Sequence, residues 1–276
     1  MLPIENLKRP DVRKIGVFDS GLGGLTVLQE LLRNHPGHEY VYFGDTAHVP
    51  YGSRSAEDVI ELVCEIAGYL VQQGCQGLIL ACNTSSALAI SALRTTVDVP
   101  VLGVIGAAAR EAAQVTSGCV AVLANPLTAS SGVYGERIRL ESKGLAKSLP
   151  RVVEIGCRDL VPIVEKGLLH TEESKHILEG YARTVLDAGA DTMVLGCTHY
   201  PLLLPVLGPL LGEGVKIVNP ATLMSDYLHP LEHQGSPTVE FKVSGSPQEF
   251  SASASRILGW DIESRQVLLR RPTQTL

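Results

Sequence analysis

Short runs of Val, Ile and Leu recur along the chain, and stretches with helical spacing separate them. The runs fall at residues 15–18, 40–43, 77–80, 99–102, 120–123, 152–155, 193–195 and 215–218. Continuous rather than alternating apolarity is typical of a strand that is covered on both faces. Helices between such strands supply the crossovers that parallel pairing needs. The pattern therefore predicts an α/β fold with mostly parallel sheets.

The predicted helices show apolar residues three or four positions apart, as at Val59, Val63, Ile66 and Leu70. We expect helices at residues 26–34, 56–73, 84–95, 107–116 and 174–188, and another that starts at Tyr200 with proline near its first position. After residue 219 the pattern changes. It predicts a helix around 221–228, an extended run at 239–243 and a short helix at 247–258.

Two segments of the chain resemble each other without a gap. Gly74-Cys-Gln-Gly-Leu-Ile-Leu-Ala-Cys82 aligns with Gly189-Ala-Asp-Thr-Met-Val-Leu-Gly-Cys197. In each copy a glycine follows a helix, where it adopts a positive φ at little cost, and a strand then ends at a cysteine. Each copy is also preceded by an earlier strand with a small polar turn, which begins at Asp19 in the first copy and at Asn125 in the second.

This repeat predicts two related halves. We expect a discontinuous first α/β domain of residues 1–105 and 219–276, because the tail should return to the first half, and a second α/β domain of residues 106–218. Ligands of open α/β sheets bind outside the carboxyl ends of the strands. The expected fold is thus two pseudo-symmetric domains with the active site in the cleft between them and one thiol on each wall.

Charge and apolar content exclude several functions. The net charge is −6 and no stretch gathers several Lys or Arg residues, so a nucleic-acid partner is not expected. No segment has the roughly 18 apolar residues that span a bilayer, and the start of the chain has no signal-peptide core, so we expect a cytoplasmic protein without a membrane partner. Its six cysteines should be reduced, with Cys64, Cys75 and Cys119 as plain structural residues.

The turn after the first strand reads Phe18-Asp-Ser-Gly-Leu-Gly-Gly-Leu-Thr26. A glycine-rich turn that enters a helix presents backbone N–H groups to an anion. The glycines do not match the GxGxxG or Walker patterns, so a small ligand such as a carboxylate is favoured over a nucleotide. The alternative is a tight structural turn with a capping Asp or Ser. A second loop, with Pro50, Tyr51 and Gly52, follows the next strand and offers further backbone donors.

The two repeated cysteines carry the strongest chemical signal. Cys82-Asn-Thr84 should open a helix whose dipole lowers the pKa of the thiol. In Cys197-Thr-His199 the histidine is a candidate proton partner of the thiol, or a hydrogen-bond partner of the ligand. A single cysteine after a strand is usually a packed core residue, but the duplication favours a pair of acid and base.

Other uses of these thiols fit the spacing less well. A zinc site of Cys82, Cys197 and His199 would lack the close CxxC pairs of structural zinc sites, so no metal is expected. The same absence argues against a CxxC redox centre. A cysteine hydrolase needs only one thiol and would leave the repeat unexplained.

Taken together, the motifs Asp19-Ser-Gly-Leu-Gly-Gly-Leu-Thr26, Asp45-Thr with Pro50-Tyr-Gly52, Ala81-Cys-Asn-Thr84 and Gly196-Cys-Thr-His-Tyr-Pro-Leu202 resemble those of the glutamate racemase family. The resemblance covers most of the chain and implies a cofactor-independent racemase that acts on glutamate. It also implies two α/β domains around the substrate, a homodimer, and a role in supplying D-glutamate for bacterial peptidoglycan.

The resemblance assigns roles to individual residues. Cys82 and Cys197 would be the two acid/base thiols, with Asp19 assisting the first and His199 the second. Besides Asp19 and His199, the residues that would line the substrate are Ser20, Pro50, Tyr51, Gly52, Asn83, Thr84, Thr128 and Thr198. The sequence departs from the family pattern at Asn125, where another threonine is common, and at Arg158, where proline is common.

A thiol pair suits inversion of an α-carbon because a proton must leave one face and another must arrive on the opposite face. One group must be a thiolate while the other is a thiol, and their roles exchange with the direction of reaction. Two alternatives remain at this point. The first is an aspartate racemase of the same superfamily, and the second is a non-catalytic ligand-binding protein that keeps the fold.

Overall fold

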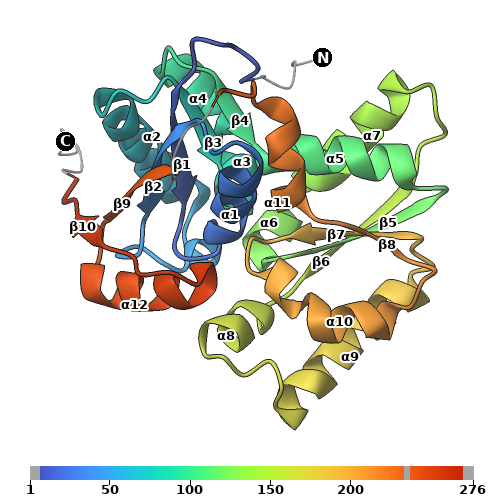
Figure 1. Cartoon of the computed structure of the whole chain (residues 1–276). Helices are drawn as coiled ribbons and strands as arrows, with labels where there is room; N and C mark the ends of the chain where they lie inside the picture. The colour runs from blue at the N-terminus through green and yellow to red at the C-terminus, as the bar shows by residue number, and fades with distance from the viewer. Residues whose placement is uncertain (1–6, 233–236, 270–276) are drawn as a thin grey trace. The chain divides into compact units, whose positions relative to one another are not determined.

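The computed structural model describes residues 7–232 and 237–269. The chain forms two compact units, one of Met1–Val104 with Met224–Leu276 and one of Ile105–Leu223. Each unit contains one sheet with helices packed on it (Figure 1). Every strand pair among the described residues is parallel, so the predicted α/β class with mostly parallel sheets is confirmed.

The first unit has a six-stranded sheet in the order β10-β9-β2-β1-β3-β4. Its strands are β1 (Lys14–Asp19), β2 (Glu39–Gly44), β3 (Gly77–Leu80), β4 (Val101–Gly103), β9 (Thr238–Val243) and β10 (Ser264–Gln266). Its helices are α1 (Leu25–Asn34), α2 (Ala56–Gln72), α3 (Asn83–Leu88), α4 (Ile90–Thr96) and α12 (Pro247–Leu258). The C-terminal part of the chain returns to this sheet, because β9 pairs with β2 along its whole length.

The second unit has a four-stranded sheet in the order β6-β5-β7-β8. Its strands are β5 (Cys119–Ala124), β6 (Arg151–Gly156), β7 (Thr192–Gly196) and β8 (Lys216–Val218). Its helices are α5 (Val104–Val115), α6 (Pro126–Ser130), α7 (Val133–Gly144), α8 (Leu160–Glu165), α9 (Glu172–Asp187), α10 (Leu204–Leu211) and α11 (Pro220–Leu223). The order β2-β1-β3-β4 within the first sheet is the same as β6-β5-β7-β8, so each repeated cysteine follows the third strand of its own set.

Burial explains why these segments take these forms. Strand β3 is buried at all four positions, and β1 and β5 are buried at nearly every position, as strands covered on both faces must be. Helix α2 buries Val59, Val63, Ile66 and Leu70 along one face. Its amino end is capped by the Ser55 side chain, which accepts a hydrogen bond from the Asp58 N–H.

The two glycines of the repeat take the predicted left-handed conformation. Gly74 has φ +83° and Gly189 has φ +61°, each between a helix and the next strand. A residue with a side chain is disfavoured at such a position, so glycine permits the tight reversal from helix to strand. The same local solution thus appears at equivalent places in both units.

Four predicted helices differ from those observed. The helix expected at 84–95 is divided into α3 and α4 at Ala89, and the helix expected at 107–116 starts earlier, at Val104. The segment expected as a helix at 221–228 consists of α11 followed by a 3₁₀ helix at Met224–Tyr227. The helix expected from Tyr200 starts as a 3₁₀ turn, Tyr200–Leu203, before α10. Residue spacing alone does not reveal these breaks, because a 3₁₀ turn and an α turn bury similar positions.

Asp191 ties the turn before β5 to the turn before β7. Its two carboxylate oxygens accept hydrogen bonds from the hydroxyls of Thr116, Ser117 and Thr192 and from the backbone N–H groups of Ser117 and Cys119. Burial by itself raises the pKa of this carboxyl, but the hydrogen bonds together outweigh burial and place the pKa well below its ordinary value. Asp191 therefore acts as a charged anchor for the amino ends of two neighbouring strands.

We expect Asp191→Asn to lower the free energy of unfolding by about 2 kcal/mol, because an amide NH₂ would face N–H and O–H donors. Since the folded pKa lies below the unfolded one, this contribution is present at neutral pH and is lost as the pH falls below about 4. Urea denaturation at neutral pH measures the effect. Asp187→Asn is the matched control because Asp187 is exposed at the end of α9. Equal stability of the two variants would contradict the assignment.

Candidate active site

The predicted site residues of the first unit lie where three neighbouring strands end. Strand β1 is flanked by β2 and β3, and the three strands end at Asp19, Gly44 and Leu80. Because the strands are parallel, the segments that follow them emerge at one edge of the sheet. This edge carries the glycine-rich turn, the loop with Pro50 to Gly52 and the segment Cys82 to Thr84.

Cys82 lies directly before α3 and is 5% exposed. Its Sγ atom is 3.5 Å from the hydroxyl oxygen of Ser20. Burial and then the negative charge of Asp19 raise the pKa of the Cys82 thiol, and hydrogen bonds from Ser85 and Ser20 oppose this rise only in part. The predicted lowering of the pKa is therefore wrong. Helix α3 has only six residues, and desolvation and Asp19 outweigh its dipole.

Asp19 is fully buried, and its Oδ1 accepts a hydrogen bond of 2.8 Å from the Gly21 N–H. The Tyr42 hydroxyl donates a 2.9 Å hydrogen bond to the Gly21 carbonyl and so holds the glycine-rich turn in place. Burial raises the pKa of Tyr42, and the charges of Asp19 and Cys82 add to the rise. Asp19, Ser20 and Cys82 therefore form one cluster in which the negative charge of Asp19 raises the pKa of the Cys82 thiol.

Gly24 sets the space available to Asp19. A Cβ atom at Gly24 would lie 2.5 Å from Cβ of Asp19 and 2.9 Å from its carboxyl carbon. We expect Gly24→Ala to displace Asp19, to lower the free energy of unfolding by about 1–3 kcal/mol and to reduce turnover. Urea denaturation and a racemization assay measure both effects. Gly68→Ala in α2 is the control, because nothing lies within 4 Å of its added Cβ. Wild-type activity in Gly24→Ala would contradict this prediction.

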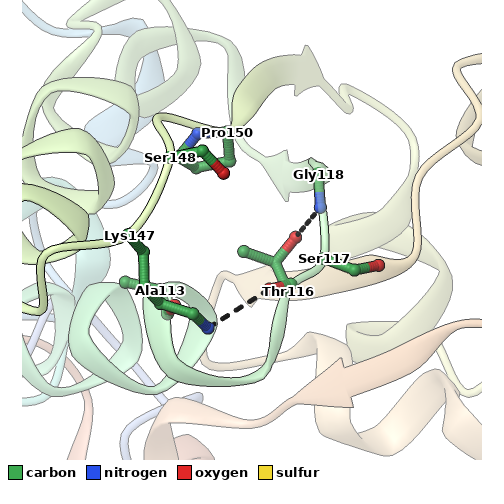
Figure 2. A pocket seen from close by; sticks show the side chains of 7 residues that line it. All are labelled: Ala113, Thr116, Ser117, Gly118, Lys147, Ser148 and Pro150. Atoms are coloured by element: carbon green, nitrogen blue, oxygen red, sulfur yellow. Dashed lines mark hydrogen bonds between the residues drawn. The ribbon is translucent and has the colours of Figure 1, made fainter.

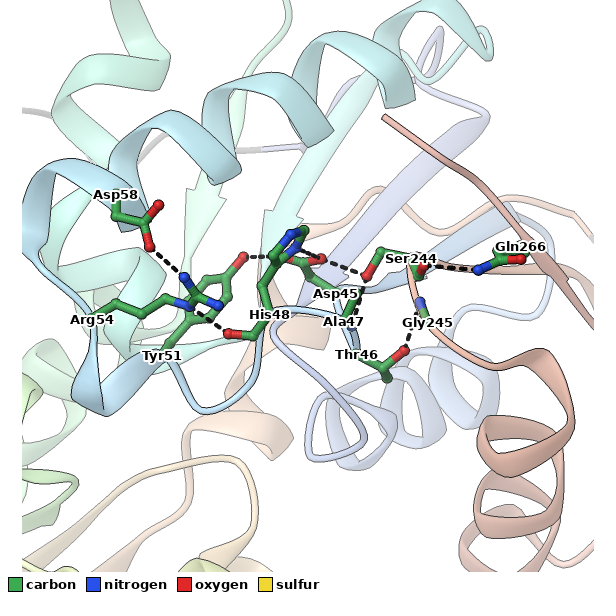
Figure 3. A network of polar contacts seen from close by, with 10 residues as sticks. All are labelled: Asp45, Thr46, Ala47, His48, Tyr51, Arg54, Asp58, Ser244, Gly245 and Gln266. Carbon is green, nitrogen blue, oxygen red and sulfur yellow. Dashed lines mark hydrogen bonds and ion pairs between the residues drawn. The ribbon is translucent and has the colours of Figure 1, made fainter. Parts of the chain in front are cut away.

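The loop after β2 is held by the buried carboxylate of Asp45, which is 1% exposed. Its Oδ2 accepts a hydrogen bond of 2.5 Å from the Tyr51 hydroxyl, and its Oδ1 lies 2.7 Å from Nδ1 of His48 (Figure 3). Burial, followed by the charge of Asp45, raises the pKa of Tyr51. The Tyr51 phenol is thus committed to Asp45, so the donors that this loop can offer a ligand are backbone groups around Pro50 and Gly52.

Asn83 and Thr84 occupy the first turn of α3 and are 3% and 1% exposed. They directly follow Cys82 in the chain, so the buried first turn of α3 carries an amide and a hydroxyl. The first unit therefore assembles its predicted catalytic and binding residues around one strand edge.

The second unit repeats this arrangement around β5, which is flanked by β6 and β7. Asn125 caps α6, because its side chain accepts a 3.0 Å hydrogen bond from the Thr128 N–H. Thr128 is fully buried. Asn125 therefore has a structural role that explains how the residue is accommodated where the family commonly has threonine. Arg158, the other departure, is exposed, and nothing in its surroundings explains the change.

Cys197 follows β7 and is 8% exposed, as are Thr198 and His199. The Cys197 Sγ lies 3.8 Å from Nδ1 of His199, and Nε2 of the same ring lies 3.1 Å from Oε1 of Glu165. If Nε2 carries the proton that bonds Glu165, Nδ1 presents its lone pair to the thiol. The predicted pairing of Cys197 with His199 thus has geometry suited to proton transfer.

Glu165 is the site residue that the sequence did not reveal. It is the last residue of α8, and its half-exposed carboxylate orients the His199 ring. It lies 34 positions from His199 in the sequence and belongs to no motif, so only the fold brings it to the His199 ring. A carboxylate that fixes the tautomer of His199 can be expected from the chemistry of histidine. Nothing in the sequence, however, identifies Glu165 as that carboxylate.

Figure 2 shows a small cavity of about 100 Å³ at the opposite end of β5, near its first residue. Lys147 lies in its wall and donates to the carbonyl oxygens of Ala113, Gln114 and Thr116 at 3.0, 2.6 and 3.4 Å. These three carbonyls use the three N–H groups of the ammonium. Lys147 therefore caps the carboxyl end of α5, and the cavity offers little to a ligand.

Within the part of the chain that the structure describes, no cluster of three or more His, Cys, Asp or Glu side chains is arranged to hold a metal ion. None of the helices in the same residues combines the length and apolarity needed to cross a bilayer. All six cysteines are free thiols. Cys75 and Cys119 are buried, whereas Cys64 is only partly buried, on α2.

Comparisons with known proteins identify the family of this chain. Residues 16–226 match the family model described as Asp/Glu/Hydantoin racemase. A glutamate racemase from Trichodesmium erythraeum is 40% identical over 255 residues, which cover 90% of this chain and 92% of the relative. The crystal structure of a glutamate racemase isoform from Bacillus anthracis has a TM-score of 0.86 and 32% identity, covering 95% of this chain and all of its own.

A second solved structure, the glutamate racemase of Francisella tularensis in complex with D-glutamate, has a TM-score of 0.83 and 27% identity, with coverage of 95% and 99%. The chain therefore belongs to the Asp/Glu/hydantoin racemase family, and within it to the glutamate racemases. It is an enzyme, an amino-acid racemase.

Proposed function

We propose that the chain interconverts L- and D-glutamate by a two-base proton transfer between Cys82 and Cys197, without a cofactor. One observation carries this proposal: each thiol follows the third strand of an identically ordered four-strand set, and each has its own polar helper. A duplicated fold that places a thiol at equivalent positions is what inversion of a carbon centre needs. The D-glutamate bound to the solved relative supports glutamate as the substrate.

In the proposed reaction, the thiolate of one cysteine removes the proton from Cα, and the electron pair of the broken C–H bond delocalises into the adjacent carboxylate. The thiol of the other cysteine then gives its proton to the opposite face. The enzyme ends with the protonation states exchanged, so it must return to the starting form before it acts again on the same enantiomer.

The α-proton is a weak acid, so the carbanion requires strong electrostatic support. In the first unit this support would come from the backbone N–H groups of the loop from Pro50 to Gly52 and of the start of α3, together with the hydroxyls of Ser20 and Thr84. Thr128 and Thr198 would play the same part in the second unit. These groups are the ones we propose to hold the two carboxylates of the substrate.

Asp19 has a further part in this proposal. Its charge raises the pKa of the Cys82 thiol in the unliganded protein. The ammonium group of a bound amino acid placed next to Asp19 would compensate that charge and so favour the thiolate. Binding of substrate would then itself prepare Cys82 as the base, and an unoccupied site would keep it protonated.

We further propose that the two compact units are two domains, predicted as 1–105 with 219–276 and 106–218, which enclose the substrate between the carboxyl ends of their sheets. Closure would exclude water from the thiolate. In a cell the enzyme would act in the cytoplasm as a homodimer and supply D-glutamate for peptidoglycan. Sedimentation equilibrium tests the dimer, and growth of a D-glutamate auxotroph that expresses the chain tests the cellular role.

The activity itself is tested by circular dichroism of the purified chain with each enantiomer of glutamate and of aspartate. The proposal predicts that the optical signal of L-glutamate and of D-glutamate decays to zero, with aspartate turned over far more slowly. Preference for aspartate would identify the aspartate racemase alternative. Binding of glutamate without any loss of optical signal would identify a non-catalytic binding protein.

A further inference from the structure

Ser244, in the C-terminal return of the chain, forms side-chain hydrogen bonds with the loop that contains Pro50 to Gly52. This residue follows β9 directly and is 8% exposed. Its hydroxyl donates a 2.6 Å hydrogen bond to Oδ1 of Asp45 and accepts a 2.9 Å hydrogen bond from the Ala47 N–H. The hydroxyl therefore acts as both a donor and an acceptor toward the loop (Figure 3).

Ser244 is itself fixed from two sides. Its N–H donates to the Gly44 carbonyl at 3.2 Å, and its own carbonyl accepts a 3.2 Å hydrogen bond from the Gln266 side chain, on β10. The next residue, Gly245, donates its N–H to the Thr46 hydroxyl at 3.1 Å. The paired strands β9 and β10 thus hold the Ser244 hydroxyl in contact with Asp45.

Asp45, held by Ser244, in turn fixes the position of the Tyr51 side chain. Its other oxygen, Oδ2, receives the Tyr51 hydroxyl at 2.5 Å, and Tyr51 is 3% exposed. Oδ1 has one further partner, Nδ1 of His48, whose side chain is 30% exposed and so is less restrained. Without Ser244, the carboxylate would lose a buried hydrogen bond and keep only a partly exposed partner on Oδ1, and the Ala47 N–H would lose its acceptor.

We infer that Ser244 is a positioning residue for substrate binding, acting through Asp45 and Tyr51 on the backbone of the loop from Pro50 to Gly52. This inference rests on the proposed function, because that function gives the loop its role in binding glutamate. A positioning role predicts an effect on KM that depends on the Tyr51 hydroxyl. A purely structural role predicts that the folded protein loses stability whether or not the Tyr51 hydroxyl is present.

The test is a double-mutant cycle in the full-length chain, with racemization of L-glutamate as the readout. We expect Ser244→Ala to raise KM about tenfold with a smaller change in kcat, because a buried hydrogen bond to a carboxylate is lost. Tyr51→Phe should raise KM to a similar extent. In the double variant the two effects should not multiply, because both changes break the same path.

Two further variants keep the result interpretable. Ser244→Thr retains a hydroxyl and should recover most of the affinity. Ser251→Ala, in α12, removes another partly buried and hydrogen-bonded hydroxyl of the same C-terminal segment, one bonded to Ser264, and should leave KM unchanged.

The outcomes separate the inference from the proposed function. A wild-type chain that does not racemize glutamate overturns the proposed function. An active wild type with an unchanged KM in Ser244→Ala overturns the inference alone. Effects of Ser244→Ala and Tyr51→Phe that multiply fully in the double variant also overturn it, because Ser244 would then act without Tyr51.

Discussion

Replacement of either Cys82 or Cys197 by alanine is expected to reduce racemization of glutamate in both directions by about a thousandfold or more. In the proposed reaction the two thiols have separate tasks, and neither can replace the other, because they belong to different units and act on opposite faces of Cα. If Cys82 is lost, the proposed reaction has no proton donor or acceptor for one face of Cα. The same holds for Cys197 and the other face.

Binding should survive these substitutions in part, since neither thiol is proposed to hold a carboxylate of the substrate. Calorimetric titration with D-glutamate separates a loss of chemistry from a loss of binding. Cys64→Ala provides the matched control, because this cysteine lies on α2, is not part of the Cys82 cluster, and should leave turnover near the wild-type rate. Wild-type turnover by Cys82→Ala or by Cys197→Ala would mean that the chemistry needs only one thiol.

The second large effect is expected for His199→Gln, which should lower kcat/KM by about a hundredfold. His199 is 3.8 Å from the Cys197 sulfur through Nδ1, so it is placed to take up the thiol proton. Glutamine cannot accept a proton, and Cys197 would then have to lose its proton to solvent. The activity of the variant should therefore rise more steeply with pH than that of the wild type.

Glu165→Gln should have a smaller effect, about tenfold, because it removes the charge that stabilises a protonated His199 ring but leaves the ring in place. His176→Gln is the control for both variants, since His176 is an exposed histidine on α9. If His199→Gln keeps the wild-type pH profile, His199 does not assist Cys197.

The two directions of reaction constrain how these effects are measured. Mirror-image acids have equal free energies, so kcat/KM must be the same for L- and D-glutamate in every active variant. The individual kcat and KM values need not match, because Asp19 supports one thiol and a His199–Glu165 pair supports the other. Because the pKa of Cys82 is raised, the form with a Cys82 thiolate is scarce at neutral pH and becomes more abundant as the pH rises.

The sequence allowed much of the site to be predicted because its residues come in short motifs attached to strand ends. Cys82 and Cys197 each follow a continuous apolar strand, and Gly74 and Gly189 mark the preceding helix ends by their positive φ. Within each sheet, parallel pairing then places the strand ends at one edge. The pairing of Cys197 with His199 was also predictable, because the two residues are only two positions apart in the sequence.

Contacts between distant segments could not be predicted in the same way. Glu165 meets His199 across 34 positions, and Ser244 meets Asp45 across 199 positions, and neither belongs to a recognisable motif. The pKa of Cys82 was predicted in the wrong direction for a related reason. A helix start is visible in the sequence, whereas the burial of the thiol and the charge of Asp19 beside it depend on tertiary packing.

The central claim is that one thiol removes the α-proton and the other supplies a new one, and racemization in D₂O tests it most directly. With L-glutamate as substrate at low conversion, the proposal predicts D-glutamate that carries deuterium at Cα, while the remaining L-glutamate keeps its original hydrogen, as measured by proton NMR. Product that retains the original hydrogen, or deuterium that enters the remaining substrate as fast as the product, would contradict the two-base account.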